Sequence, residues 1–134
     1  MTAICEHCGT SFEVRLIHNG FNNTSYAYCS DCGMTALLNA YGKRWPADVK
    51  WTYAEIAPEM EQHLQPCECG GRFIKGNSPR CPHCKHVLSA DKATSYIEAQ
   101  FPGTVGGWRW QRDWHELYCI IINDRRVEDI FKSL

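Results

Sequence analysis

The chain has 134 residues, which suffices for one ordinary domain or two small ones, and its formal net charge of −1 lacks the strongly basic footprint of most nucleic-acid-binding proteins. No apolar run approaches the roughly 20 residues that a membrane helix needs, and the first residues lack the basic and apolar stretches of a signal peptide. We therefore expect a soluble, reduced, cytoplasmic protein whose nine cysteines serve a purpose other than disulfide formation.

The first predicted domain spans residues 1–46 and contains two C-x2-C pairs. These pairs are Cys5 with Cys8 and Cys29 with Cys32. Between them, apolar and polar residues alternate over 12–16 and 26–28, on either side of Asn19-Gly20, which predicts a β-hairpin. Good helix formers from Met34 to Tyr41 predict a short helix directly after the second pair.

Two correctly spaced C-x2-C pairs joined by a hairpin predict a closed, tetrahedral Zn²⁺ site, because each pair places two sulfurs on one tight turn. The predicted ligands of this first site are Cys5, Cys8, Cys29 and Cys32. Protein would fill all four coordination positions, so no position remains for an activated water. Unrelated free thiols are the alternative.

The stretches "CEHCG" and "YAYCSDCGMTALLNAYGK" resemble the GATA-type treble-clef zinc finger over residues 5–43. This resemblance implies a knuckle, a hairpin, a second knuckle and a short helix, with the same four cysteines as zinc ligands. The loop "HNGFNNTSYAY" lacks the dense Arg and Lys that the family uses on DNA. We therefore expect the fold, rather than the DNA binding, to carry over.

Residues 47–66 form a predicted helical connector. Thr52 and Glu55 have the spacing of a capping box, and Pro58 is placed to begin a helical turn that runs through Leu64.

The third predicted domain, residues 67–134, begins with another cysteine quartet. Its members are Cys67, Cys69, Cys81 and Cys84. A tight hairpin around Lys75-Gly76-Asn77 would bring the two pairs together, and residues 67–88 resemble a rubredoxin-like zinc ribbon. A second Zn²⁺ is therefore predicted, with an iron site and a redox-active Cys81-Pro82-His83-Cys84 dithiol as alternatives. The ligand order of a zinc deaminase does not occur.

A helix is predicted from about Ala90 to Gln100, with Ser89 as its N-cap and Ala93, Tyr96 and Ile97 on its buried face. After it, β-rich stretches at 108–110, 117–122 and 125–130 predict a small antiparallel β-meander. Cys119 lies in one of these stretches and is predicted to be a buried apolar residue.

Two features of the sequence indicate where a partner could bind. Trp108, Trp110 and Trp114 form an aromatic patch that is either core, a protein-binding surface or a base-stacking surface. Five basic residues surround the second quartet, where they would screen an anionic zinc centre or make a weak contact with RNA or DNA. They are Arg72, Lys75, Arg80, Lys85 and Lys92.

Together these patterns predict a small α+β protein with two Zn²⁺ ions: a treble-clef-like finger, a helical connector, and a zinc ribbon with a helix and an antiparallel β-meander. No catalytic motif occurs, so we expect a non-enzymatic protein-interaction module or adaptor. A nucleic-acid-binding zinc-finger protein of transcription or RNA metabolism is the alternative.

Overall fold

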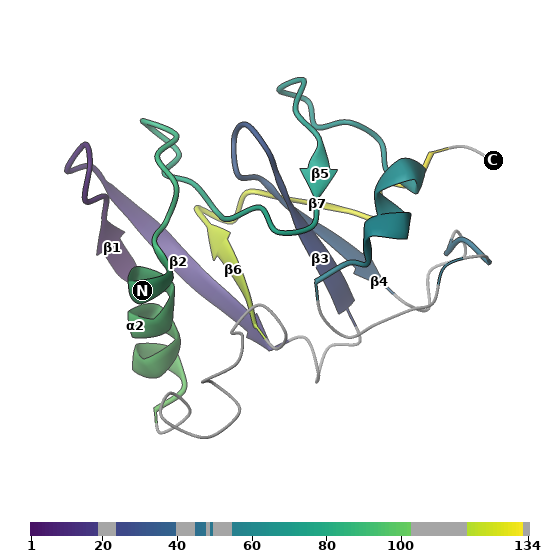
Figure 1. Cartoon of the computed structure of the whole chain (residues 1–134). Helices are drawn as coiled ribbons and strands as arrows, with labels where there is room; N and C mark the ends of the chain where they lie inside the picture. Colours follow the sequence, from purple (N-terminus) through teal and green to yellow (C-terminus); the bar gives the residue numbers. More distant parts are fainter. Residues whose placement is uncertain (19–23, 40–44, 48, 50–54, 103–117, 133–134) are drawn as a thin grey trace.

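The structure of the protein is a computed structural model that describes residues 1–18, 24–39, 45–47, 49, 55–102 and 118–132. The Asn19-Gly20 turn, the Thr52 capping position and the Trp108, Trp110 and Trp114 patch lie outside the described residues. Two β-sheets stand side by side, each accompanied by one helix (Figure 1). The described part of the chain contains no helix long and apolar enough to cross a membrane.

The first sheet contains three antiparallel strands in the order β1-β2-β6. They span Thr2–Ile4, Ser11–His18 and Tyr118–Ile122. Apolar residues alternate along β2, and the face that they form packs against helix α2, Ala90–Gln100. The predictions for this helix are confirmed: the Ser89 hydroxyl accepts a hydrogen bond from the Lys92 N–H at 3.3 Å, and Ala93, Tyr96 and Ile97 are buried.

The second sheet contains four strands in the order β5-β3-β4-β7. They span Phe73–Ile74, Thr24–Cys29, Thr35–Asn39 and Arg126–Glu128, and β7 lies parallel to β4. A 3₁₀ helix, η1, spans Pro58–His63 and begins with Pro58, as predicted for the connector. Each sheet thus combines strands from residues 1–46 with strands from residues 67–134.

Two predictions for the N-terminal third are wrong. Strands β2 and β3 do not pair with each other, because β2 pairs with β1 and β6 while β3 pairs with β4 and β5. The predicted helix from Met34 to Tyr41 contains strand β4 instead. All residues from Thr35 to Leu38 are buried, which suits a central strand covered on both faces and overrides the helix propensity of this stretch.

The predicted antiparallel β-meander is also wrong. β6 and β7 are separated by the turn at Asn123-Asp124, but β6 pairs with β2 and β7 pairs with β4 in the other sheet. The reason lies at Asn123, whose N–H donates to the Glu13 carbonyl at 2.9 Å while its side-chain oxygen accepts from the Glu13 N–H at 2.8 Å. These bonds extend the β2–β6 ladder through the turn residue. The chain then crosses to the second sheet.

The turn after β5 is also unlike its prediction. Gly76 adopts a positive φ of 89°, as a tight turn requires, but β5 pairs with β3 rather than with a strand after the turn. The predicted hairpin at Lys75–Asn77 is therefore a turn without a local partner strand.

The two sheets meet at Tyr28, which is fully buried. Its hydroxyl accepts a hydrogen bond from the Ile120 N–H at 2.7 Å and donates to the Ile120 carbonyl at 3.0 Å. Cys119 packs in the same apolar cluster with no exposed surface, which confirms its prediction as a buried residue.

Candidate metal centres

Eight cysteine side chains form two groups of four in the described part of the chain. We call Cys5, Cys8, Cys81 and Cys84 the outer group, and Cys29, Cys32, Cys67 and Cys69 the inner group. Within each group the four sulfur atoms lie within 4.8 Å of one another. The inner group is nested in the sequence between the two halves of the outer group.

The spacing of the sulfur atoms fits a tetrahedral metal ion. In the outer group, Cys5 Sγ lies 3.6 Å from Cys84 Sγ, and Cys8 Sγ lies 3.7 Å from Cys81 Sγ. In the inner group, the Cys29–Cys69 and Cys32–Cys67 sulfur pairs lie 3.4 and 3.6 Å apart. Four thiolates at a Zn–S distance of about 2.3 Å would be separated by about 3.8 Å. Either group could therefore hold one metal ion.

Three of the four cysteine pairs sit on the same kind of turn. The N–H four residues after the first cysteine donates to that cysteine's carbonyl: Gly9 to Cys5 at 3.0 Å, Gly33 to Cys29 at 3.2 Å, and Lys85 to Cys81 at 3.0 Å. A backbone N–H inside each turn also points at the first sulfur. The donors are His7 to Cys5 at 3.3 Å, Asp31 to Cys29 at 3.4 Å and His83 to Cys81 at 3.4 Å. Such N–H···S bonds stabilise a thiolate and orient it toward a metal.

The C-x-C pair, Cys67 and Cys69, is a shortened version of this turn. Here the N–H three residues on, at Gly70, donates to the Cys67 carbonyl at 2.9 Å, and the Gly71 N–H donates to Cys69 Sγ at 3.4 Å. The C-x-C turn is thus one residue shorter than a C-x2-C turn, but it retains the closing hydrogen bond and an N–H···S contact.

Close packing holds the inner group in place. A Cβ atom at Gly71 would lie 2.6 Å from Cys29 Sγ, so only glycine allows this approach. Three of the four thiols are buried in an apolar cluster that includes Met60, Phe73 and Phe131, and Cys69 is exposed. Burial raises the pKa of the Cys67 thiol well above its usual range. A bound cation would offset this penalty by stabilising the thiolate.

The outer group is more accessible. Cys5 and Cys81 are buried beside helix α2, whereas Cys84 is half-buried and Cys8 is exposed. The Thr10 hydroxyl, 3.4 Å from Cys8 Sγ, lowers the pKa of that thiol to about 6. The Cys8 backbone N–H likewise lowers the pKa of Cys5. Cys8 is thus prepared to bind a cation as a thiolate near neutral pH, and the pKa of Cys5 is shifted in the same direction.

A direct contact links the two groups. Gly33 follows the last cysteine of one inner pair, and Arg80 precedes the first cysteine of one outer pair. A Cβ atom at Gly33 would lie 2.5 Å from the Arg80 backbone nitrogen, so the two turns touch through their backbones.

The model of one protein family, a domain of unknown function (DUF8255), matches residues 1–90. The chain belongs to this family. The matched DUF8255 region includes all eight clustered thiols and ends where α2 begins. Comparisons with curated proteins and with solved structures gave no match.

The structure of this DUF8255 chain brings together the eight cysteines that the sequence singled out, but in a different pairing. The prediction joined Cys5 and Cys8 to the pair at Cys29, and Cys67 and Cys69 to the pair at Cys81. Instead, the first pair joins the fourth and the second joins the third. Four pairs allow three such pairings, and their spacing does not distinguish among them. The strand pairing is what indicates the correct grouping. β1–β2 and β3–β4 are the hairpins, and each has one C-x2-C pair at its turn.

Proposed function

We propose that this DUF8255 chain is a non-enzymatic protein-interaction module or adaptor whose fold is held by two structural Zn²⁺ ions, one in each thiol group. One observation carries the proposal: two closed groups of four cysteines each join a hairpin of the N-terminal part to a turn of the C-terminal part. Four thiolates leave no coordination position open for a substrate, as is typical of structural zinc. Each centre is ribbon-like, with one knuckle at a hairpin turn and a second knuckle facing it.

Zinc suits the donor set better than the other common divalent ions. Soft thiolate ligands select zinc or iron over magnesium, calcium or manganese, and tetrahedral geometry favours zinc or an iron–sulfur centre. A rubredoxin-like iron site remains the competing occupant, because it uses the same four sulfurs.

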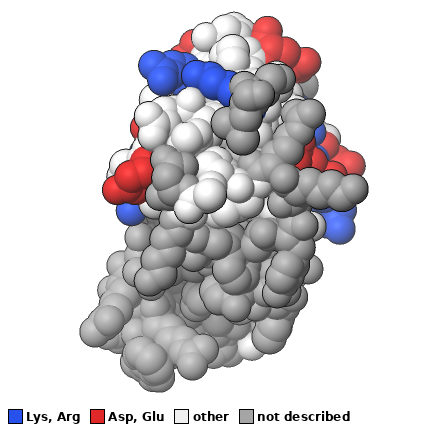
Figure 2. Space-filling view, turned by 90° about the vertical axis from the view of Figure 1, so that its right-hand side faces the viewer, with Lys and Arg blue, Asp and Glu red and all other residues white. Residues whose placement is uncertain are grey.

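The distribution of charge favours a protein partner over a nucleic acid. On the face shown in Figure 2, the described residues carry Asp and Glu side chains as well as Lys and Arg side chains. Affinity for nucleic acid comes largely from a concentration of positive charge, and the formal net charge of the chain is −1 before any anionic metal centre is counted.

Native mass spectrometry with elemental analysis tests the proposal. We expect two zinc ions per chain and no iron. Removal of the metal by a chelator is expected to abolish the cooperative thermal transition, because structural zinc contributes on the order of 10 kcal/mol per site in finger peptides at neutral pH. A protein that melts unchanged after chelation, or that carries iron, would overturn the zinc assignment. Tight, salt-dependent binding to DNA or RNA would instead support the alternative function.

A further inference from the structure

One edge of the first sheet presents backbone groups that are not paired by the described part of the chain. In the β1–β2 pair, the Val14 N–H donates to the Met1 carbonyl at 2.7 Å and the Cys5 N–H donates to the Thr10 carbonyl at 3.0 Å. Antiparallel pairing alternates between hydrogen-bonded and non-hydrogen-bonded positions, so the N–H and C=O groups of Thr2 and Ile4 point away from β2. No described residue forms a backbone hydrogen bond with these outward groups.

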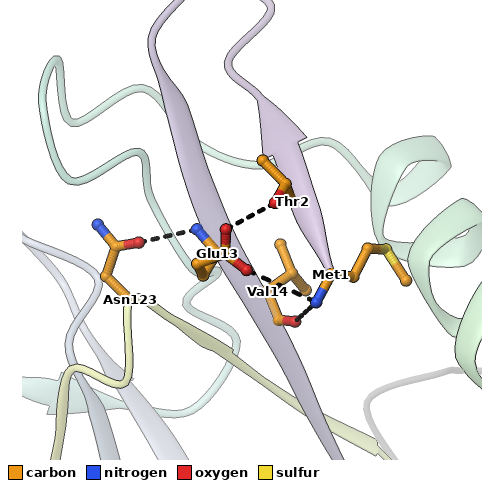
Figure 3. Close-up of polar contacts among 5 residues, drawn as sticks. All are labelled: Met1, Thr2, Glu13, Val14 and Asn123. Carbon is orange, nitrogen blue, oxygen red and sulfur yellow. Dashed lines mark hydrogen bonds and ion pairs between the residues drawn. The ribbon is translucent and has the colours of Figure 1, made fainter.

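The edge is held in an ordered position. The Thr2 hydroxyl donates to Glu13 Oε1 at 2.6 Å, and the Met1 amino group donates to the Val14 carbonyl at 3.2 Å and lies 3.7 Å from Glu13 Oε2 (Figure 3). The Glu13 N–H in turn donates a hydrogen bond to the side-chain oxygen of Asn123. The outward groups of β1 are therefore presented by a strand that is already fixed on its inner side, which lowers the entropic cost of adding a further strand.

An apolar notch lies beside this edge. It is small, with a cavity volume of about 20 Å³, and its lining includes Ile4, Phe12, Val87, Leu88 and Tyr96. The large apolar side chains that are exposed in the described part of the chain are Met1, Ile4 and Val87, at 44, 63 and 39%. Ile4 and Val87 line the notch, and Met1 immediately precedes β1. A notch of this size has room for about one or two water-sized groups, such as the methyl groups at the tip of an apolar side chain.

The outer edges of β6 and β7 are protected. The outer edge of β6 is occupied by the Tyr28 hydroxyl, which bonds to both backbone groups of Ile120. β7 has Arg126 and Glu128 on either side of a single valine and is followed by Asp129 at a positive φ of 47°. Charged residues and local distortions are the usual protection of strand edges against pairing. β1 has neither of these protections.

We propose that the outer edge of β1 and the notch beside it bind an extended segment of a partner protein, which adds to the first sheet as a fourth strand and inserts an apolar side chain between Ile4 and Val87. An extended backbone is the occupant that offers donors and acceptors at the spacing of Thr2 and Ile4. The inference rests on the proposed function as an interaction module, in which this surface would bind the partner.

Selection of random heptapeptides displayed on phage against the zinc-loaded protein tests this inference. We expect enrichment of sequences in which apolar and polar residues alternate. In the ¹⁵N spectrum of the protein, a selected peptide is expected to shift the amide signals of Thr2, Ile4 and Leu88 and to slow the hydrogen exchange of the first two.

Three variants distinguish the contribution of the β1 edge to peptide binding from that of the notch. Ile4→Pro removes an outward N–H without removing a bond to β2, and Val87→Ser removes an apolar wall of the notch; each is expected to raise the Kd of the selected peptide at least about tenfold. Glu128→Lys, on the edge of β7, is the matched control and is expected to leave the Kd unchanged. Each variant is first shown to retain two metal ions and the wild-type circular dichroism.

Unchanged binding by both Ile4→Pro and Val87→Ser would overturn the inference, as would enrichment of helical sequences with apolar residues three and four apart. Sedimentation as a dimer that Ile4→Pro abolishes would assign the edge to a second copy of this chain and would overturn it too. The metal content is measured separately, so failure of the peptide selection with two zinc ions bound would leave the structural-zinc proposal standing.

Discussion

At the scale of single residues, the four cysteine turns share one backbone requirement. The residue after the last cysteine adopts a positive φ in every turn: 75° at Gly9, 72° at Gly33, 95° at Gly70 and 64° at Lys85. Glycine adopts this conformation without a penalty, whereas a residue with a Cβ atom pays about 1 kcal/mol or more. Lys85 is the exception, and its Nζ donates to the Pro82 carbonyl at 3.0 Å.

Replacement of Lys85 by glycine is expected to stabilise the zinc-loaded protein relative to Lys85→Ala. Both changes remove the side chain and its bond to Pro82, but only glycine also relieves the strained backbone. The expected difference in the free energy of unfolding is about 1 kcal/mol, as measured by urea denaturation at a fixed excess of zinc. Equal stabilities of the two variants would show that the turn is not strained at this position.

The contact between Gly33 and Arg80 predicts unequal effects of the same substitution in two equivalent turns. Gly9→Ala meets no heavy atom within 4 Å, so its cost is the backbone strain alone, about 1 kcal/mol. Gly33→Ala adds a clash with the Arg80 backbone and is expected to be clearly more destabilising. Because Arg80 adjoins Cys81, Gly33→Ala is also expected to weaken metal binding by the outer group, which competition with a chromogenic chelator would measure. Similar effects of the two substitutions would contradict a direct contact between the groups.

At the scale of secondary-structure elements, the junction between the sheets depends on one hydroxyl. Tyr28 lies on β3, in the second sheet, and bonds to both backbone groups of Ile120 on β6, in the first. This hydroxyl takes the place that a neighbouring strand would occupy along β6. Burial of the ring raises the pKa of Tyr28 well above its usual value, so the hydroxyl remains a donor throughout the physiological range.

Tyr28→Phe is expected to cost about 1–3 kcal/mol of stability, because it leaves a buried N–H and a buried C=O of Ile120 without their partner. Tyr96→Phe, on the buried face of α2, is the matched control and is expected to change stability by less than about 0.5 kcal/mol. Thermal unfolding of the two zinc-loaded variants provides the measurement. If Tyr28→Phe leaves the stability unchanged, water or a shift of β6 must supply hydrogen-bond partners for the N–H and C=O of Ile120.

Local signals in the sequence predicted local structure well and strand partners poorly. The Ser89 cap and the spacing of Ala93 and Ile97 fix α2 because a helix forms all its hydrogen bonds within one segment. The strand patterns at 12–16 and 26–28 were also correct, but a strand pattern does not identify its partner. β4 was mistaken for a helix because its two faces are buried by residues far away in the sequence. Ala36 and Leu38 belong to the cluster that contains Met60 and Phe131, whereas Leu37 belongs to the cluster that contains Ile121.

At the scale of the whole molecule, the nested thiol groups determine how the chain closes. Cys32 and Cys67 are 35 positions apart, whereas Cys8 and Cys81 are 73 positions apart. The entropic cost of closing a loop grows by about 0.6 kcal/mol per doubling of its length, so the inner group closes at the lower cost. Once it has closed, the free chain between Cys8 and Cys81 is shortened by about half.

We therefore expect the first zinc ion to bind the inner group. When the apoprotein receives less than one equivalent of zinc and is then treated with iodoacetamide, the single-metal species should be alkylated at Cys5, Cys8, Cys81 and Cys84. Peptide mapping by mass spectrometry measures the labelled positions. Protection of these four thiols together with labelling of Cys29 and Cys67 would show that the outer group binds the first zinc ion. Cys119 is buried outside both groups and reports on global unfolding in the same experiment.

The nested arrangement also has a consequence for synthesis on the ribosome. Cys5, Cys8, Cys29 and Cys32 are the first four clustered thiols to emerge, and they form two pairs with the spacing of a complete zinc site, yet the folded protein separates them. Translation from Cys32 to Cys84 takes on the order of several seconds at ordinary elongation rates. A zinc ion captured by the first four thiols during that interval must be released before either native centre can form, so the nascent chain depends on metal exchange to reach its fold.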